Sequence, residues 1–163
     1  MKKLVLVAVA FVFLFAAVGT AFAKGKSGAA GKSNVSHLYL YEKDASYVIV
    51  PNGAWGKMKY NLSGPTFDFV FNGHALEPST SYTLIYYPDP WPGTGLICLG
   101  NAMSNEGGNV HIAGSVNTGS LEGAKIWLVL SSDVNCTAKT MIGWNPNEYL
   151  FENNLISYTA GGH

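Results

Sequence analysis

Residues 67–72 have the sequence FDFVFN, in which three phenylalanines are separated by single residues. Side chains alternate between the two faces of a strand, so this spacing predicts a strand with one strongly apolar face. The Asn72-Gly73 pair that follows is typical of a tight turn, and we expect this strand to end there.

The same alternation occurs nearer the N-terminus. Leu38 and Leu40 alternate with His37, Tyr39 and Tyr41. A period of two places these sets on opposite faces, so we expect the leucines to point inward and the other three side chains outward.

Further short runs of aromatic and branched residues follow at regular intervals, and none has helical spacing. Segments 81–87 and 125–130 are apolar or amphipathic on both faces, which predicts central, buried strands. About nine strands with turn signals between them predict an all-β fold, a single antiparallel β-sandwich of immunoglobulin-like or similar type, or a small barrel. The other predicted strands are residues 47–50, 56–62, 96–100, 109–116, 149–151 and 155–158.

The N-terminus has the pattern of a secretory signal peptide. Lys2 and Lys3 precede an uncharged apolar stretch at 4–18, and Ala21-Phe22-Ala23 supplies a small-x-small cleavage site. Cleavage after Ala23 predicts a secreted or cell-surface protein. The alternative is an uncleaved anchor, because the apolar stretch is only slightly shorter than the ~20 residues that span a bilayer.

Composition divides the rest of the chain into three parts. Residues 24–34 contain Gly, Ala, Ser, Lys and Asn without a large apolar side chain, which predicts a flexible tether. Residues 35–158 form the predicted β domain, with five lysines against ten carboxylates, and residues 159–163 form a predicted disordered tail.

Cys98 and Cys136 are the two cysteines of the chain. In an exported protein an even number of cysteines favours a disulfide, here one that connects the two layers of the sandwich. Two separate buried thiols are the alternative. A zinc site is disfavoured because the closely spaced C-x-x-C pair is missing.

The composition also argues against several classes of function. The chain has no Arg, the residue that grips phosphates and guanine edges, and its domain is acidic, so we expect no nucleic-acid partner. Neither G-x-S-x-G nor S-x-x-K occurs, and the Gly31-Lys32-Ser33 triplet lies in the tether. No cofactor is expected.

Four segments resemble a family of uncharacterised secreted β-rich domains in archaea and bacteria. They are GAWGKMKYN, YTLIYYPDPWPGTGLICLG, GNVHIAGSV and GAKIWLVLSSDVNC, all within residues 53–136. The resemblance implies secretion and a β-rich fold, and it implies no activity, cofactor or catalytic residue.

His37, His74 and His111 are weak candidates for metal ligands, because a β fold can bring distant strands together. They lack the H-x-H pair of copper/zinc superoxide dismutases, and no His separates Cys136 from Met141 as a blue-copper site requires. We therefore predict no metal site and expect surface or hydrogen-bonded histidines.

Residues 86–93, YYPDPWPG, hold Trp91 between two prolines. An indole held in a stiff loop could form a stacking platform for a sugar ring or a partner protein, together with Tyr39, Tyr41 and Tyr87. The alternative is that Trp91 folds back and caps the end of the domain.

The remaining tryptophans, Trp55, Trp127 and Trp144, are predicted to lie in the core. Asn34 and Asn61 begin N-x-S triplets and are predicted glycosylation acceptors, whereas Asn135 is disfavoured by its neighbour Cys136.

These features predict a non-enzymatic binding or structural module that contacts a surface glycan or another extracellular protein through exposed aromatics and loops. A membrane contact is expected only if the N-terminal segment stays uncleaved. The alternative is a secreted metal-binding or hydrolytic enzyme that uses histidines and carboxylates brought together by the fold.

Overall fold

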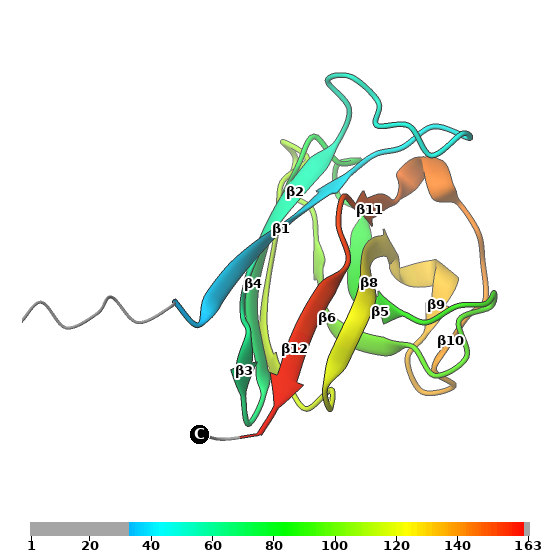
Figure 1. Cartoon of the computed structure of the whole chain (residues 1–163). Coiled ribbons are helices and arrows are strands. Elements are labelled where there is room, and N and C mark those ends of the chain that lie inside the picture. The colour runs from blue at the N-terminus through cyan, green and yellow to red at the C-terminus, as the bar shows by residue number, and fades with distance from the viewer. Residues whose placement is uncertain (1–32, 162–163) are drawn as a thin grey trace, which may run out of the picture. The chain divides into compact units, whose positions relative to one another are not determined.

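The computed structural model describes residues 33–161, so the predicted signal peptide and nearly all of the predicted tether lie outside the described residues. The described part contains twelve strands and two short 3₁₀ helices and has no α-helix, which confirms the all-β prediction (Figure 1). Among these residues, no helix has the length and apolar character needed to cross a membrane.

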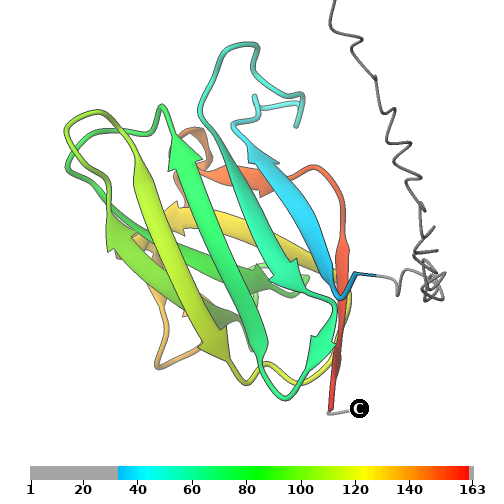
Figure 2. The ribbon, with the colours of Figure 1, turned by 90° about the vertical axis from the view of Figure 1, so that its left-hand side faces the viewer.

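One part of the main sheet consists of four antiparallel strands that lie side by side (Figure 2). In spatial order they are β1 (Val35–Tyr41), β2 (Trp55–Asn61), β4 (Phe67–His74) and β7 (Val110–Val116).

The other part of the sheet faces these four strands across the core. β11 pairs with both β1 and β8, so it joins the two parts into one ten-stranded sheet. The strands of this part are β6 (Ile97–Met103), β5 (Ser81–Tyr87), β8 (Leu121–Leu130), β11 (Leu150–Glu152), β12 (Ile156–Ala160) and β3 (Ser63–Gly64).

The topology differs from the predicted single antiparallel sandwich of about nine strands. β3 pairs with β12 in parallel, which makes the sheet mixed, and a two-stranded sheet stands apart from it. β12 also extends through Thr159 and Ala160, which we had predicted to lie in the disordered tail. Ala160 donates its backbone N–H to the Ser120 hydroxyl, and this bond holds the end of the strand.

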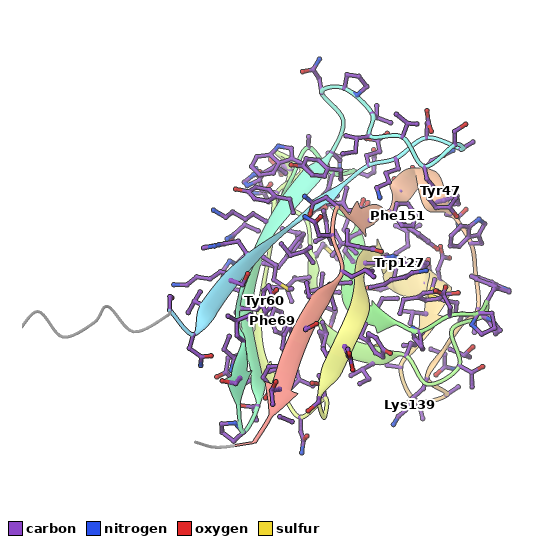
Figure 3. The ribbon with its side chains drawn as sticks, viewed as in Figure 1. Tyr47, Tyr60, Phe69, Trp127, Lys139 and Phe151 are labelled. Atoms are coloured by element: carbon purple, nitrogen blue, oxygen red, sulfur yellow. A yellow bond between two sulfur atoms is a disulfide. The ribbon has the colours of Figure 1, made fainter. Side chains whose placement is uncertain are left out.

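The principal core lies between the two parts of the sheet. Tyr60 of β2 and Phe69 of β4 point from the first part toward the second (Figure 3). The predicted alternation is confirmed in β1 and β4, whose inward positions are buried and whose outward positions are not. Opposite them, the buried side chains of the second part include Leu84, Leu99, Leu121, Ile126 and Leu128.

The predicted turn at Asn72-Gly73 is wrong, because β4 continues to His74. Gly73 pairs with Gly56 of β2, and both point inward beside the ring of Phe71. A Cβ at Gly56 would lie 2.3 Å from that ring, and one at Gly73 would lie 2.8 Å from the side chain of Val110. Close packing, rather than a turn, explains the glycine at position 73.

A second core lies on the outward face of β5 and β8. Ile85 and Tyr87 of β5 and Trp127 and Val129 of β8 point to this side and are buried. Both faces of the two strands are therefore covered, as predicted from their sequences.

Two segments cover this face, and we call them together the cover: residues 88–96 and residues 131–149. The cover packs Leu96, Val134, Met141 and Tyr149 against the strands. Backbone hydrogen bonds from Gly95 to Lys139 and from Met141 to Pro92 tie the two segments together. The second segment contains η1 (Ser131–Asp133), β9 (Val134–Asn135), β10 (Thr140–Met141) and η2 (Pro146–Glu148).

The disulfide between Cys98 and Cys136 is present, with the two Cα atoms 5.7 Å apart. It connects β6 to the turn between β9 and β10, so it attaches the cover to the sheet. Our expectation that it connects the two layers was wrong, because the segment that carries Cys136 leaves the main sheet.

The predicted strand at 47–50 is wrong. These residues belong to the loop between β1 and β2, where an isolated bridge joins Lys43 to Ile49. Tyr47 has a positive φ of 60° and is 60% exposed. The Asp44 carboxylate accepts hydrogen bonds from the backbone N–H groups of Ser46 and Val48, which forms a local turn instead of a ladder.

Candidate functional site

A cleft of about 610 Å³ opens where the cover meets the outward face of β5 and β8. Its residues come from four stretches that are distant in the sequence: the β1–β2 loop, residues 87–91 at the end of β5 and in the first segment of the cover, β8, and the second segment of the cover. Five of the seven are aromatic. They are Tyr47, Tyr87, Asp89, Trp91, Lys125, Trp127 and Trp144.

Trp91 and Trp144 form the exposed aromatic wall of this cleft. Their side chains are 51% and 41% exposed. Their rings meet edge to face, with centroids 5.3 Å apart and planes 76° apart. Trp91 therefore stays accessible to solvent and is not folded away as a cap, and the ring of Trp144 supports it from the side.

Tyr87 and Trp127 form a buried layer at the base of the cleft. Their rings stack with centroids 3.8 Å apart and planes 13° apart. Trp127 also contacts the ring of Phe151 at 5.2 Å, and Tyr47 contacts Phe151 at 5.8 Å (Figure 3). Burial raises the pKa of the Tyr87 hydroxyl, and the nearby charge of Asp89 raises it further.

The polar part of the cleft consists of one ion pair. The Lys125 ammonium donates a hydrogen bond of 2.5 Å to the Asp89 carboxylate, and the two side chains are 32% and 63% exposed. An ammonium carries three donors and a carboxylate carries two acceptor oxygens. The pair can therefore offer both donors and acceptors to a polar ligand beside the aromatic wall.

A buried hydrogen-bond network holds the segment that carries Trp144. Asp133 is 5% exposed and accepts hydrogen bonds from the Tyr149 hydroxyl and from the Asn145 amide, the latter at 2.8 Å. The Tyr149 hydroxyl in turn accepts the backbone N–H of Asn145. Burial, followed by the hydrogen bond to Asp133, raises the pKa of Tyr149 well above its usual range. Trp144 lies between these anchors and packs on the Tyr149 ring at 5.6 Å.

Glu152 lies next to the base of the cleft. Burial raises the pKa of its carboxyl group above the usual range. Its own backbone N–H, Lys43, the indole of Trp127 and Lys125 offset only part of this rise. Its Oε2 atom is buried and has no hydrogen-bond partner within residues 33–161. Glu152 does not line the cleft, so Asp89 is the one carboxylate among the cleft residues.

The structure brings two of the four predicted ligand-binding residues, Trp91 and Tyr87, into the cleft. Tyr39 and Tyr41 lie elsewhere, on the outward face of β1, where their rings stack with centroids 6.3 Å apart. The prediction that these four residues bind a ligand stays a prediction.

Two of the three tryptophans that we expected in the core are exposed. Trp127 is buried, as predicted, but Trp144 is 41% exposed and Trp55 is 38% exposed. Trp55 occupies an outward position of β2, opposite Tyr41 and His74. Trp144 follows Gly143 and precedes Asn145-Pro146, a loop signal that could have placed it at the surface.

The three histidines lie on the outward face of β1, β4 and β7 without converging. His74 makes a hydrogen bond through Nδ1 to the Asn109 side chain, and His111 makes one through Nδ1 to the Asn72 side chain. His37 pairs across strands with Lys59. Among residues 33–161, no three His, Cys, Asp or Glu side chains are placed to share a metal ion.

Both predicted glycosylation acceptors make hydrogen bonds at the corner between β2 and β4. The Asn61 amide donates to the carbonyl of Thr66 at 2.8 Å and accepts the backbone N–H of Asp68 at 2.9 Å. The Asn34 amide donates to the carbonyl of Ser63 at 2.9 Å. A glycan on either amide nitrogen would replace one of its two N–H donors.

The chain matches no protein-family model, no curated protein and no solved structure. The resemblance to secreted β-rich domains therefore stays a prediction, and a proposal for function depends on the chemistry of the cleft.

Proposed function

We propose that this protein is an extracellular, non-enzymatic binding module, with the sandwich-like arrangement of its sheet as scaffold, and that its cleft binds a sugar ring of a glycan. The observation that carries the proposal is the exposed pair of Trp91 and Trp144 beside the Lys125–Asp89 ion pair. A pyranose has apolar C–H faces and a polar rim of hydroxyl groups. An indole complements the face, and the charged pair complements the rim.

The rigidity of the aromatic wall supports this proposal. Trp144 packs on Trp127 and Tyr149, and Trp91 lies between Pro90 and Pro92, whose rings fix the local φ angles. Side chains that are already ordered lose little conformational entropy when a ligand binds, so more of the contact energy contributes to affinity.

The number of carboxylates in the cleft favours sugar binding over glycoside hydrolysis. Most glycoside hydrolases place two carboxyl groups on either side of the scissile bond. Asp89 alone lines this cleft, and Lys125 already holds it as an ion pair. The disulfide between Cys98 and Cys136 supports the extracellular setting, because such bonds persist in oxidising compartments.

A glycan array followed by calorimetric titration of the best ligand tests the proposal. We expect Trp91→Ala to weaken binding by about tenfold or more, because a stacked indole is a typical hot spot. Met103→Ala, at an exposed apolar residue of β6 outside the cleft, is the matched control and should bind as the parent does.

The melting temperature of each variant separates binding from packing. Trp91→Ala should melt within a few degrees of the parent because the side chain is half exposed. Two results would overturn the proposal: an array without any bound glycan, or an affinity that Trp91→Ala leaves unchanged.

A further inference from the structure

A second aromatic and polar surface covers the outward face of β1, β2, β4 and β7, which Figure 2 shows from the front. Strand register aligns its side chains in rows across the sheet. One row runs Tyr41–Trp55–His74, and the next runs Tyr39–Lys57–Asn72–His111. We call this surface the outer face.

The outer face differs in charge from the rest of the domain. Lys57 and Lys59 occupy two successive outward positions of β2. His37 pairs with Lys59, and His74 and His111 occupy other outward positions of the same face. The only carboxylate at an outward position of these four strands is Asp68, two positions before Val70, which pairs with Lys59. Residues 35–158 as a whole contain ten carboxylates and five lysines, so this face lacks the negative charge that dominates elsewhere.

Asp68, the single carboxylate of the outer face, already accepts hydrogen bonds from neighbouring side chains. Asp68 accepts hydrogen bonds from Ser115 at 2.5 Å and from Thr66 at 2.8 Å, and these bonds lower its pKa. Lys57 lies 5.4 Å above the ring of Tyr39, with no carboxylate as its partner in a salt bridge among residues 33–161. Lys59 borders a shallow hollow of about 380 Å³, which Asp68 also lines.

The outer face is continuous with the cleft. Trp127 pairs with Phe151, Phe151 with Tyr41, and Tyr41 with Trp55, so one register row crosses β8, β11, β1 and β2. Paired residues place their side chains on the same side of a sheet. Trp127 and Phe151 are buried, and the exposed ring of Tyr47 packs on Phe151, so Tyr47 is the exposed aromatic side chain of the cleft that lies over this row.

We propose that the outer face binds the continuation of the chain whose sugar ring lies in the cleft, and that this chain is an acidic polysaccharide. Its carboxylate or sulfate groups lie against Lys57 and Lys59, and its sugar rings lie on Trp55 and the stacked pair of Tyr39 and Tyr41. This inference rests on the proposed function, which supplies the first sugar site. The charge of the face selects an anionic ligand, and its continuity with the cleft selects a chain rather than a single sugar.

Two matched pairs of probes test the charge requirement: a short oligogalacturonate against its methyl ester, and dextran sulfate against dextran. We expect the charged member to bind more tightly in at least one pair. The preference should weaken as ionic strength rises from about 0.01 M to about 1 M, because the screening length falls from about 30 Å to about 3 Å.

A double variant, Lys57→Gln with Lys59→Gln, tests the residues. It should bind the preferred charged probe about threefold to tenfold more weakly at low salt and bind the neutral partner as the parent does. Lys139→Gln, at an exposed position of the cover remote from the outer face (Figure 3), removes one positive charge and should change neither affinity. Trp55→Ala should weaken binding of the preferred charged probe and leave the affinity for a disaccharide unchanged.

Three results would overturn the inference. They are equal affinity of both members in each pair, an unchanged affinity of the double variant, and tighter binding of single-stranded oligothymidylate than of either acidic sugar. None of these results bears on the proposal that the cleft binds a sugar ring. The proposed function fails separately, if Trp91→Ala leaves binding of neutral sugars intact.

Discussion

The Tyr149 hydroxyl donates a hydrogen bond to the buried carboxylate of Asp133, and the two residues bracket the segment that carries Trp144. Asp133 ends η1, the short helix that follows β8, whereas Tyr149 immediately precedes β11. These strands are neighbours in the sheet. The bond therefore closes the 131–149 segment at its base, and the geometry of the cleft depends on it.

Removal of this hydroxyl should destabilise the cover. Tyr149→Phe keeps the ring contact with Trp144 but leaves the Asp133 carboxylate and the Asn145 N–H with one partner fewer. We expect the free energy of unfolding to fall by about 1–3 kcal/mol, measured by urea denaturation. Tyr86→Phe, at a half-buried tyrosine of β5, serves as the control. Equal stability of parent and Tyr149→Phe would show that the network contributes nothing.

The disulfide should contribute to the free energy of unfolding because it closes a long loop. Cys98 and Cys136 are separated by 38 positions. Replacement of both by serine should cost about 4 kcal/mol, because the unfolded chain regains loop entropy. Hydrogen exchange should accelerate most at β9 and β10 and least at β2 and β4. A uniform acceleration across all strands would contradict the assignment of the disulfide to the cover alone.

Periodicity in the sequence predicted most of the fold, because alternation depends on local geometry. FDFVFN formed a strand with three buried phenylalanines, and the runs with two apolar faces became β5 and β8. The errors arose where contacts between residues distant in the sequence determine the local structure. Gly73 is a glycine because the Phe71 ring and Val110 fill the space beside it, and no turn rule contains that information.

Gly56→Ala tests this packing argument. The new methyl group would lie 2.3 Å from the Phe71 ring and 3.0 Å from the backbone oxygen of Asn72. The ring is fully buried, so it has little freedom to move away. We expect a loss of about 1–3 kcal/mol in unfolding free energy. The control is Gly107→Ala in the exposed β6–β7 loop, which should cost much less. Similar losses for both would refute the packing explanation.

The raised pKa of Glu152 predicts a pH-dependent effect of Glu152→Gln. Between the unfolded pKa, near 4.3, and the higher folded pKa, the folded state binds more protons. The stability of the parent therefore falls as pH rises through this window. The loss of unfolding free energy caused by the buried, ionised carboxylate reaches its full size above the folded pKa. It is absent below the unfolded pKa.

Glu152→Gln removes this cost. The variant should melt at a higher temperature than the parent at pH about 7, and the difference should vanish at pH about 3. Glu122→Gln, at an exposed position of β8, should melt as the parent does at both pH values. A difference that persists at low pH would show that the effect does not arise from ionisation.

The candidate site could be predicted only in part. Trp91 was identifiable because prolines flank it in a loop, but Trp144, Tyr47 and Lys125 were not grouped with it. These residues meet because β8 lies beside β5 and because the cover folds back over both strands. Strand order and the path of a loop are properties of the whole chain, which explains why spacing in the sequence could not reveal the cleft.

The four tryptophans of the chain can report directly whether a sugar binds in the cleft. Each indole N–H gives one signal in a two-dimensional ¹H–¹⁵N NMR spectrum, assigned with single Trp→Phe variants. Titration with a disaccharide unit of the sugar selected on a glycan array should shift the signals of Trp91 and Trp144 and leave that of Trp55 in place. Unchanged Trp91 and Trp144 signals at a saturating sugar concentration would contradict the assignment of the cleft as the binding site.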